Sequence, residues 1–347
     1  PIMMGISSGL SVAIYWIWAY VINDAAPIAR LPLFSDMIVF MSYAMQVVMG
    51  FLLMGALFIV LPRTMVSAKR INQVLDLHSS IQNLAQVQLA DENLKGQVEF
   101  KDVTFRYAAN SEAVIENVSF RAEAGQTVAF IGSTGSGKST LVNLIPRFYD
   151  VSAGEILVDG VNVQDYALED LRNKVGYIPQ KAVLFSGDVK DNLDFGQSQE
   201  TPLSEQAMWQ ALELAQSKNF IEDKEAGLES EVAQGGTNFS GGQRQRLAIA
   251  RALARKPEIL IFDDSFSALD YKTDRVLRQE LAEKTKSMTK LIVAQRISTI
   301  MDADLILVLD QGKVVGQGTH KELLANNGVY QEIAYSQLSK EELEHGK

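Results

Sequence analysis

The sequence predicts two parts of different fold class, an all-α N-terminal hairpin and an α/β domain. Two long runs without any charged residue, residues 2–22 and 37–61, predict the two helices of the hairpin. A glycine-rich loop lies between a strand-like apolar run at residues 128–131 and a helical apolar pattern. Beyond this loop strand-like runs alternate with helical patterns, which is typical of a mostly parallel sheet, and residues 305–315 predict a late hairpin.

The charge of the chain is distributed unevenly. The net charge is −10, but residues 1–95 carry five basic and five acidic side chains, so the acidic excess belongs to the remainder. An acidic domain without a basic patch argues against nucleic acid as a partner. The sequence has no cysteine, which excludes disulfides and thiolate metal sites and suits a reducing cytosol.

The two uncharged runs are long enough to cross a lipid bilayer, since a transmembrane helix needs about 20 apolar residues. Basic residues follow the second run from Arg63 onward, whereas the connection at residues 23–36 carries only Arg30. The positive-inside rule therefore predicts that residues 23–36 lie outside and that the chain from Arg63 onward is cytoplasmic. Buried helices of a soluble protein are the alternative. We expect a multi-pass protein of the plasma membrane.

The ends of the hairpin lead to three further expectations. Because the chain starts with Pro1 inside an apolar segment, without a basic region before it, we expect an incomplete N-terminus rather than a signal peptide. Residues 61–88 lack glycine and contain one proline, which predicts that the second helix continues beyond the membrane. A polar connection then predicts two domains, residues 1–92 and 96–347. Two helices cannot enclose a transport pathway, so further membrane helices are expected.

The α/β domain is organised around the glycine-rich loop, whose residues are Gly132, Ser133, Thr134, Gly135, Ser136, Gly137, Lys138, Ser139 and Thr140. Strand, glycine loop and helix in this order predict a phosphate-binding loop, with backbone N–H groups and a helix N-terminus facing a polyphosphate. Lys138 would reach the β- and γ-phosphates, and the Ser139 hydroxyl would help to hold Mg²⁺. A flexible Gly/Ser turn is the alternative. The sequence therefore predicts binding of ATP or a related nucleotide.

A second motif, Phe239-Ser240-Gly241-Gly242-Gln243, opens a helical stretch at residues 244–254. An apolar run at residues 259–262 then leads into Asp263 and Asp264. Together with the phosphate loop, these motifs resemble the ABC transporter family, specifically a half-transporter of the bacterial multidrug-exporter type. The resemblance covers essentially the whole chain. It implies an α/β P-loop NTPase domain of ABC type, with a mixed core sheet, an antiparallel β subdomain and a helical subdomain.

The resemblance also implies roles for individual residues. Tyr107 is expected to stack on adenine, Asp263 to hold Mg²⁺ with Ser139, and Gln180 to contact Mg²⁺ and the attacking water. The signature loop, Ser240, Gly241, Gly242 and Gln243, is expected to close on ATP bound to a second ABC subunit. Ser240 is a good helix N-cap, and the two glycines expose N–H groups at the positive end of the helix. Asp270 matches the family's D-loop.

Two catalytic positions depart from the family pattern. Asp264 stands where the family has a glutamate as general base, and Gln295 stands where it has a histidine. The shorter Asp264 loses roughly 1.5 Å of reach, and a glutamine cannot carry the positive charge of a histidine. The sequence therefore predicts a Walker site that binds ATP but hydrolyses it slowly. Because the signature loop and D-loop look intact, we expect a heterodimer in which the partner's site is competent.

The resulting prediction is a subunit of an ATP-driven exporter that uses MgATP and acts on an amphipathic small-molecule or lipid substrate. One alternative is an ATP-gated channel or a regulatory ABC subunit. Another is a homodimeric exporter in which Asp264 suffices as the base. A soluble DNA-repair ATPase shares the signature loop, but the two predicted membrane spans exclude it.

Overall fold

The structure is a computed structural model that describes residues 2–83, 94–196 and 202–338. The chain divides into two compact units, Pro1–Ser80 and Ile81–Lys347. The predicted boundary at residues 92–96 falls partly on residues 84–93, which lie outside the described part of the chain.

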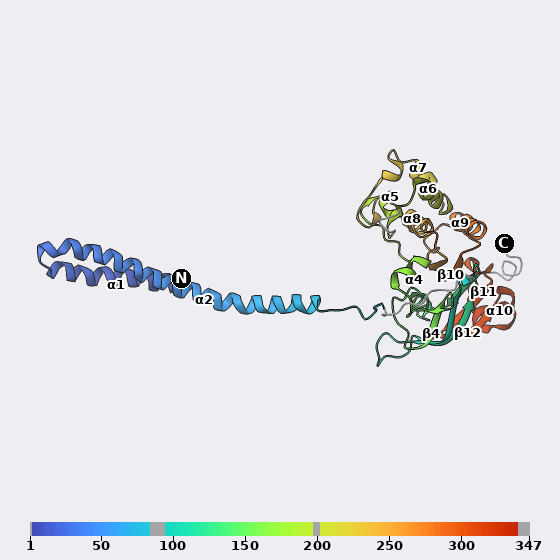
Figure 1. Ribbon diagram of the computed structural model, residues 1–347, viewed down its shortest axis with the longest axis horizontal. Coiled ribbons are helices and arrows are strands. Elements are labelled where there is room, and N and C mark those ends of the chain that lie inside the picture. The colour runs from blue at the N-terminus through green and yellow to red at the C-terminus, as the bar shows by residue number, and fades with distance from the viewer. Residues whose placement is uncertain (1, 84–93, 197–201, 339–347) are drawn as a thin grey trace. The chain divides into compact units, whose positions relative to one another are not determined.

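The first unit is a helical hairpin, drawn in blue in Figure 1, in which α1 (Ile2–Asp24) and α2 (Arg30–Leu75) lie side by side. The rings of Trp18 and Phe40 meet across the pair with centroids 6.2 Å apart. The Ser7 and Ser11 hydroxyls each lie 3.8 Å from the Met45 sulfur. Both helices are long and apolar enough to span a membrane by length and composition. The two helices of the prediction are confirmed.

The hairpin differs from the prediction at two places. The expected connection at residues 23–36 is wrong, because α2 already begins at Arg30 and only a short turn with a 3-10 segment (Pro27–Ala29) separates the helices. The Arg30 guanidinium donates to carbonyl oxygens at the end of α1, those of Asn23 and Ala25, and so caps this helix. The predicted continuation of the second helix past its apolar run is confirmed as far as Leu75, where α2 ends, but the helix does not extend through the whole stretch at residues 61–88.

The early end of α2 follows from the residues after it. Asp76 forms the C-cap, and a histidine and two serines, all weak helix formers, follow at residues 78–80. A sequence without glycine or proline is therefore not sufficient to continue this helix. Residues 84–88 of the prediction lie outside the described residues.

The second unit contains the two predicted sheets. The antiparallel sheet has the order β2-β1-β4-β5, with β1 (Val98–Phe105), β2 (Ile115–Ala122), β4 (Ala153–Val158) and β5 (Val161–Asn162). The mixed sheet has the order β12-β11-β3-β10-β9-β6, with β3 (Thr127–Gly132), β6 (Val175–Ile178), β9 (Ile259–Asp263), β10 (Thr289–Val293), β11 (Leu305–Asp310) and β12 (Lys313–Gly318). All its strand pairs are parallel except β11–β12, which is the predicted late hairpin.

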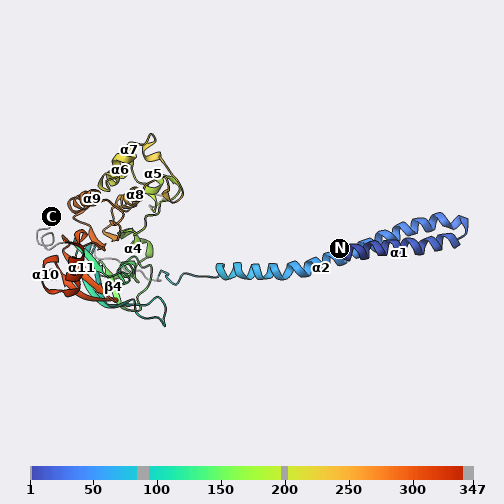
Figure 2. The ribbon, with the colours of Figure 1, turned by 180° about the vertical axis from the view of Figure 1, so that it is seen from behind.

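A helical region forms a separate part of this unit. It consists of α5 (Val189–Asp194), α6 (Glu205–Leu214), α7 (Lys218–Glu222) and α8 (Gly241–Ala254), and a small two-stranded ladder of β7 (Gly187–Asp188) and β8 (Glu231–Val232) joins its ends. Figures 1 and 2 show α5, α6 and α7 gathered away from the sheets, whereas α8 packs against β6. The remaining helices are α3 (Lys138–Asn143), α4 (Leu168–Lys174), α9 (Tyr271–Lys284), α10 (His320–Asn326) and α11 (Gly328–Gln337). The mixed sheet, the antiparallel sheet and the helical subdomain agree with the predicted fold class.

The helix after the phosphate loop is shorter than its apolar pattern suggests. Leu141, Leu144 and Ile145 are buried as predicted, but α3 ends at Asn143 and the chain continues in 3-10-like turns. Pro146 cannot donate a backbone hydrogen bond and disfavours a helical residue before it, which ends the helix here. Phe148, predicted on the buried face, is 42% exposed.

A buried ion-pair network holds the start of the second unit. The Asp159 carboxylate, in the turn between β4 and β5, accepts hydrogen bonds from the Gly96 and Gln97 backbone N–H groups at 2.7 and 3.0 Å. Its other oxygen lies 2.8 Å from the Lys174 ammonium, which also pairs with Glu258 at 2.7 Å. Asp159 is 1% exposed, so these partners replace water completely.

We expect the Asp159→Asn variant to destabilise this unit by about 3 kcal/mol, because it leaves Lys174 short of one negative partner in a buried network. The measurement is the unfolding midpoint in a urea or thermal titration. Asp102→Asn is the matched control, since Asp102 also has a left-handed φ but is exposed, and asparagine tolerates that conformation. Equal midpoints for the two variants would show that the network does not stabilise the fold.

Candidate functional site

The predicted nucleotide residues line a pocket at the carboxyl ends of β3, β9 and β10. Its volume is about 240 Å³. The lining residues come from the phosphate loop, from one earlier segment and from three later ones: Val114, Thr134, Gly135, Gly137, Lys138, Ser139, Thr140, Gln180, Asp264, Val293 and Gln295. Parallel strands bring their carboxyl ends to one edge of a sheet, where ligands of α/β proteins bind. The fold thus assembles residues that lie far apart in the sequence.

Glycine is required at both ends of the phosphate loop. At Gly132 a Cβ would collide with the carbonyl oxygen of Leu309 on the neighbouring strand. At Gly137, which has a left-handed φ of 96°, a Cβ would lie 2.7 Å from the Ile115 side chain. Only glycine lets the backbone turn this tightly between β3 and α3, so that the N–H groups point inward.

Lys138 is folded into this loop. Its ammonium donates to the carbonyl oxygens of Gly132 and Ser133 at 2.9 and 2.8 Å and to the Ser136 hydroxyl at 3.2 Å. Burial lowers the pKa of Lys138, although the negative charges of Asp264 and Asp263 act in the opposite direction. A bound polyphosphate would offer anionic oxygens, which make stronger hydrogen bonds with an ammonium than carbonyls do.

Asp263 lies beneath the pocket and is held from two sides. Its Oδ1 accepts a hydrogen bond from the Ser139 hydroxyl at 2.7 Å, and its Oδ2 accepts one from the Tyr177 hydroxyl at 3.1 Å. Burial and the charge of Asp263 both raise the pKa of Tyr177, so this residue remains a donor. The sequence analysis did not assign a role to Tyr177, which has no signal other than its place three residues before Gln180.

The pair of Ser139 and Asp263 fits Mg²⁺, which prefers hard oxygen ligands and keeps few protein ligands beside phosphates and water. Within the described residues no group of three or more His, Cys, Asp or Glu side chains could hold a metal ion. Gln180, the third predicted metal residue, lines the same pocket as Ser139, and its amide donates to Asp264. Of the three predicted metal ligands, Ser139 and Asp263 are joined by a hydrogen bond.

Asp264 lies at the centre of the pocket and receives two amide donors on one oxygen. The Gln180 and Gln295 Nε2 atoms lie 2.9 and 2.7 Å from the same Oδ2 atom. Asp264 is 7% exposed, and burial raises the pKa of its carboxyl, an effect that the Gln180 hydrogen bond partly offsets. Its backbone has a left-handed φ of 49°, and its carbonyl oxygen accepts a bond from the Ser267 hydroxyl. The three residues predicted to be catalytic thus form one cluster.

Tyr107 lies at the edge of the site with its hydroxyl 2.9 Å from the Thr140 hydroxyl. The Phe105 and Tyr149 rings contact it in edge-on geometry, with centroids 4.9 and 5.2 Å away. Tyr107 is 54% exposed. The two edge-on contacts fix the orientation of its ring, and neither Phe105 nor Tyr149 stacks on the face of the ring. An exposed, oriented ring of this kind can stack on a flat base.

The signature loop lies outside this chain's own pocket. Ser240 caps α8 through a capping box, in which its hydroxyl accepts the Gln243 N–H and the Gln243 side chain accepts the Ser240 N–H. A Cβ on Gly241 would meet nothing within 4 Å, so the start of the helix is open. The D-loop lies beside it, since a Cβ on Gly242 would lie 3.5 Å from the Ala268 carbonyl oxygen. Asp270 caps the next helix, α9.

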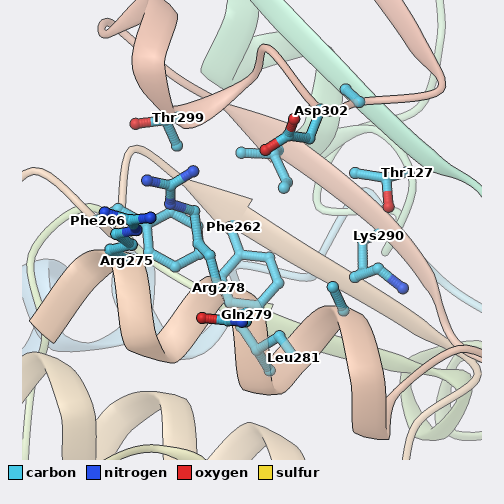
Figure 3. A pocket seen from close by; sticks show the side chains of 13 residues that line it. Thr127, Phe262, Phe266, Arg275, Arg278, Gln279, Leu281, Lys290, Thr299 and Asp302 are labelled. Atoms are coloured by element: carbon cyan, nitrogen blue, oxygen red, sulfur yellow. The ribbon is translucent and has the colours of Figure 1, made fainter. Parts of the chain in front are cut away.

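A second and larger cavity, of about 410 Å³, lies between α9 and the mixed sheet. Figure 3 shows the side chains of Arg275, Arg278 and Gln279, which α9 contributes to it. None of the described residues that line this cavity belongs to the predicted site.

Comparisons with known proteins agree with these motifs. Residues 115–267 match the family model described as ABC transporter. The chain is 45% identical over 303 residues to an uncharacterized ABC transporter ATP-binding protein of Mycobacterium tuberculosis (strain ATCC 25618 / H37Rv). The aligned stretch covers 87% of this chain and 52% of that protein. It is 45% identical over 239 residues to the ATP-dependent lipid A-core flippase of Pseudomonas aeruginosa. This alignment covers 69% of this chain and 39% of the flippase.

The fold is similar to a solved structure of a bacterial Atm1-family ABC exporter with ATP bound. The TM-score is 0.76 at 28% sequence identity, and the match covers 97% of this chain and 59% of the exporter chain. The chain thus spans about half the length of the curated relatives it matches.

Proposed function

We propose that this chain, whose residues 115–267 match the ABC transporter family model, is a subunit of an ATP-driven membrane exporter. The observation that supports this most is that two long apolar helices precede the ATPase domain in one chain. The solved exporter that matches 97% of the chain supports the same arrangement. The substrate we propose is an amphipathic small molecule or a lipid, the latter in line with the name of the flippase relative.

The proposed membrane topology follows from charge. Residues 25–29 lie outside, the chain from Arg63 onward is cytoplasmic, and the bilayer is that of the plasma membrane. Many large apolar side chains of the hairpin are not covered by other residues of this chain, and lipid or further membrane helices would cover them.

We propose that ATP binds with its base on Tyr107 and its phosphates in the loop from Gly132 to Thr140. The orientation of the Tyr107 ring and the inward ammonium of Lys138 support these roles. Ser139 and Asp263 would hold Mg²⁺, which neutralises charge on the phosphate oxygens. Val114 and Val293 line the same pocket and exclude water from its wall.

Hydrolysis at this site is proposed to be slow because of the cluster around Asp264. A general base must lie within about 2.6–3.2 Å of the proton that it abstracts. The Oδ2 atom of Asp264 already accepts from two amides, and the side chain is one methylene shorter than glutamate. Gln295 donates to that oxygen but cannot hold a positive charge near the γ-phosphate. The site thus retains ATP, and its geometry does not favour attack by water.

The open signature loop supports a second ABC half-transporter as partner. None of the four residues of this loop, Ser240, Gly241, Gly242 and Gln243, lines this chain's own pocket, and their helix N-terminus suits an anion. We propose a head-to-tail dimer in which this loop and Asp270 complete the partner's ATP site. A heterodimer gives one retaining site and one competent site, whereas a homodimer would have two slow sites.

The experiment that tests the exporter uses the full-length protein with its partner in liposomes. We expect amphipathic compounds or lipids to stimulate ATP hydrolysis and to move across the bilayer in an ATP-dependent manner. ATP-dependent ion conductance without stimulated hydrolysis would support an ATP-gated channel instead. Steady hydrolysis by the purified chain without any partner would contradict the heterodimer.

A further inference from the structure

The backbone next to Gln295 is held by one side chain from the C-terminal helix. Gln337 is the last residue of α11, and its Nε2 donates to the Gln295 carbonyl oxygen at 2.8 Å. Its Oε1 accepts from the Ile297 N–H at 2.9 Å. A single amide thus pairs with the backbone on both sides of Arg296, in the manner of a neighbouring strand.

The helix that carries Gln337 is anchored to the core. Tyr330 and Ala334 of α11 are fully buried, and the Tyr330 hydroxyl lies 2.6 Å from the His320 ring nitrogen Nδ1. Asn327 caps the helix by accepting the Tyr330 N–H and also donates to the Val315 carbonyl of β12. Gln295, in contrast, lies in an exposed loop between β10 and the 3-10 turn Ile297–Thr299. A fixed element therefore holds the backbone at two exposed residues, Gln295 and Arg296, which lie between the buried Ala294 and Ile297.

A second side chain holds the same segment from another helix. The Arg278 guanidinium of α9 donates to the Ser298 carbonyl oxygen at 3.0 Å. Asp274 fixes this guanidinium with two hydrogen bonds at 3.1 and 3.0 Å. In Figure 3, Arg278 and Thr299 both border the larger cavity, so α9 and the segment after Gln295 lie close together there. Arg278 fixes residue 298, whereas Gln337 alone among the described side chains bonds to the backbone of residue 295.

We propose that Gln337 is a positioning residue for the ATP site. By fixing the carbonyl of residue 295 and the N–H of residue 297, it sets the direction of the Gln295 side chain. That direction places the Gln295 amide 2.7 Å from the Asp264 Oδ2 atom. The inference rests on the proposed function in one respect, namely that residue 295 faces the γ-phosphate. It links the end of α11 to the reacting part of the site without any contact between Gln337 and the nucleotide.

The size of the effect follows from the nature of the contact. Two partly exposed hydrogen bonds to backbone contribute modestly, and displacement of a reacting group by about 1 Å can slow a reaction by up to about 100-fold. We expect Gln337→Ala to lower kcat about five- to tenfold at a competent version of the site. KM for ATP should remain unchanged, because Gln337 touches none of the groups that would hold the nucleotide.

The test uses the full-length protein in two backgrounds, the native chain and the Asp264→Glu, Gln295→His chain. Each receives Gln337→Ala, and each receives Gln331→Ala as matched control. Gln331 lies on the same helix and also donates to a backbone carbonyl, but to that of Leu324 in α10 rather than to that of residue 295. Lower kcat with unchanged KM for Gln337→Ala, and no change for Gln331→Ala, is the expected result. Equal effects of the two substitutions would overturn the proposal.

Gln337→Glu gives a second test, the pH dependence of turnover, which would not change if Gln337 only stabilised the fold. A glutamate carboxylate cannot donate to the carbonyl of residue 295, whereas the protonated acid can. Turnover of this variant, relative to its parent, should therefore rise as the pH falls from 8 to 5, towards the ordinary glutamate pKa of about 4.3. A ratio that does not change with pH would contradict the positioning role even if Gln337→Ala is inactive.

The two backgrounds separate the failure of this inference from that of the slow-site proposal. The Asp264→Glu, Gln295→His chain gains no turnover if the native site already hydrolyses ATP at a normal rate. In that case Gln337→Ala must lower kcat in the native background. If the substituted chain gains turnover but Gln337→Ala leaves kcat unchanged in it, the positioning role is wrong and the slow-site proposal stands.

Discussion

Replacement of Gly241 by aspartate is expected to reduce ATP turnover of the assembled transporter by about 100-fold or more, the size of effect seen when one electrostatic contact to a reacting group is lost. In the proposed dimer the start of α8 faces the γ-phosphate of the ATP held by the partner. A carboxylate at this position would repel that phosphate. Because the competent site depends on this loop, nearly all turnover should disappear. The measurement is steady-state ATP hydrolysis by the complex.

The structure indicates that this substitution leaves the chain folded. A Cβ on Gly241 meets nothing within 4 Å, and a negative charge in the first turn of a helix is favourable. Gly328→Asp is the matched control, because Gly328 is also the first residue of a helix, α11, with open space around it. Normal turnover by the Gly241→Asp complex, with Gly328→Asp also normal, would show that the signature loop does not serve a partner's nucleotide.

The Asp264→Glu, Gln295→His chain is expected to hydrolyse ATP about tenfold faster or more at its own Walker site, since a positioned general base contributes 10²–10⁴-fold. Glutamate restores the reach towards the attacking water. Histidine removes one of the two amides from the carboxylate oxygen and can hold a positive charge. The side chains of residues 264 and 295 are in direct contact, so their effects are not additive. Each single substitution should give less than half of the gain of the double substitution.

The same two chemical changes at exposed positions form the control for this variant. Asp302→Glu and Gln279→His lie beside the larger cavity, away from the nucleotide pocket, and should leave turnover unchanged. If the substituted chain is folded and binds ATP but hydrolyses it no faster than the native chain, the proposal that Asp264 and Gln295 make this site slow is contradicted.

The fold could be predicted where local sequence and long-range packing agree. The phosphate loop is recognised from the spacing of its own residues, although the atoms that require glycine at Gly132 and Gly137 belong to Leu309 and Ile115. Ser240 caps α8 through a motif confined to four residues. The alternation of strands and helices then indicated the mixed sheet. The antiparallel sheet and the helical subdomain followed from the family resemblance, not from periodicity.

Features that depend on distant contacts or on backbone termination were not predictable. The apolar pattern after the phosphate loop continued to Phe148, but Pro146 ends the helix earlier. Hydropathy predicted the apolar run at residues 37–61, but not the bounds of the helix that contains it. Helix α2 begins before this run, at Arg30, and ends after it, where residues of weak helix propensity follow. The convergence of Gln180 and Gln295 on one oxygen of Asp264 joins three segments of the chain. No spacing rule indicates it, and none indicates the contact of Gln337 with residue 295.

The most direct test of the central claim is the identity of the nucleotide that stays on this chain. The full-length complex is incubated with MgATP, separated rapidly from free nucleotide, and its bound ATP and ADP are measured over time. The account predicts that about one ATP per complex is retained intact, and that Lys138→Ala in this chain abolishes that retained ATP. Conversion of all bound ATP to ADP at the rate of overall turnover would contradict a slow site built around Asp264 and Gln295.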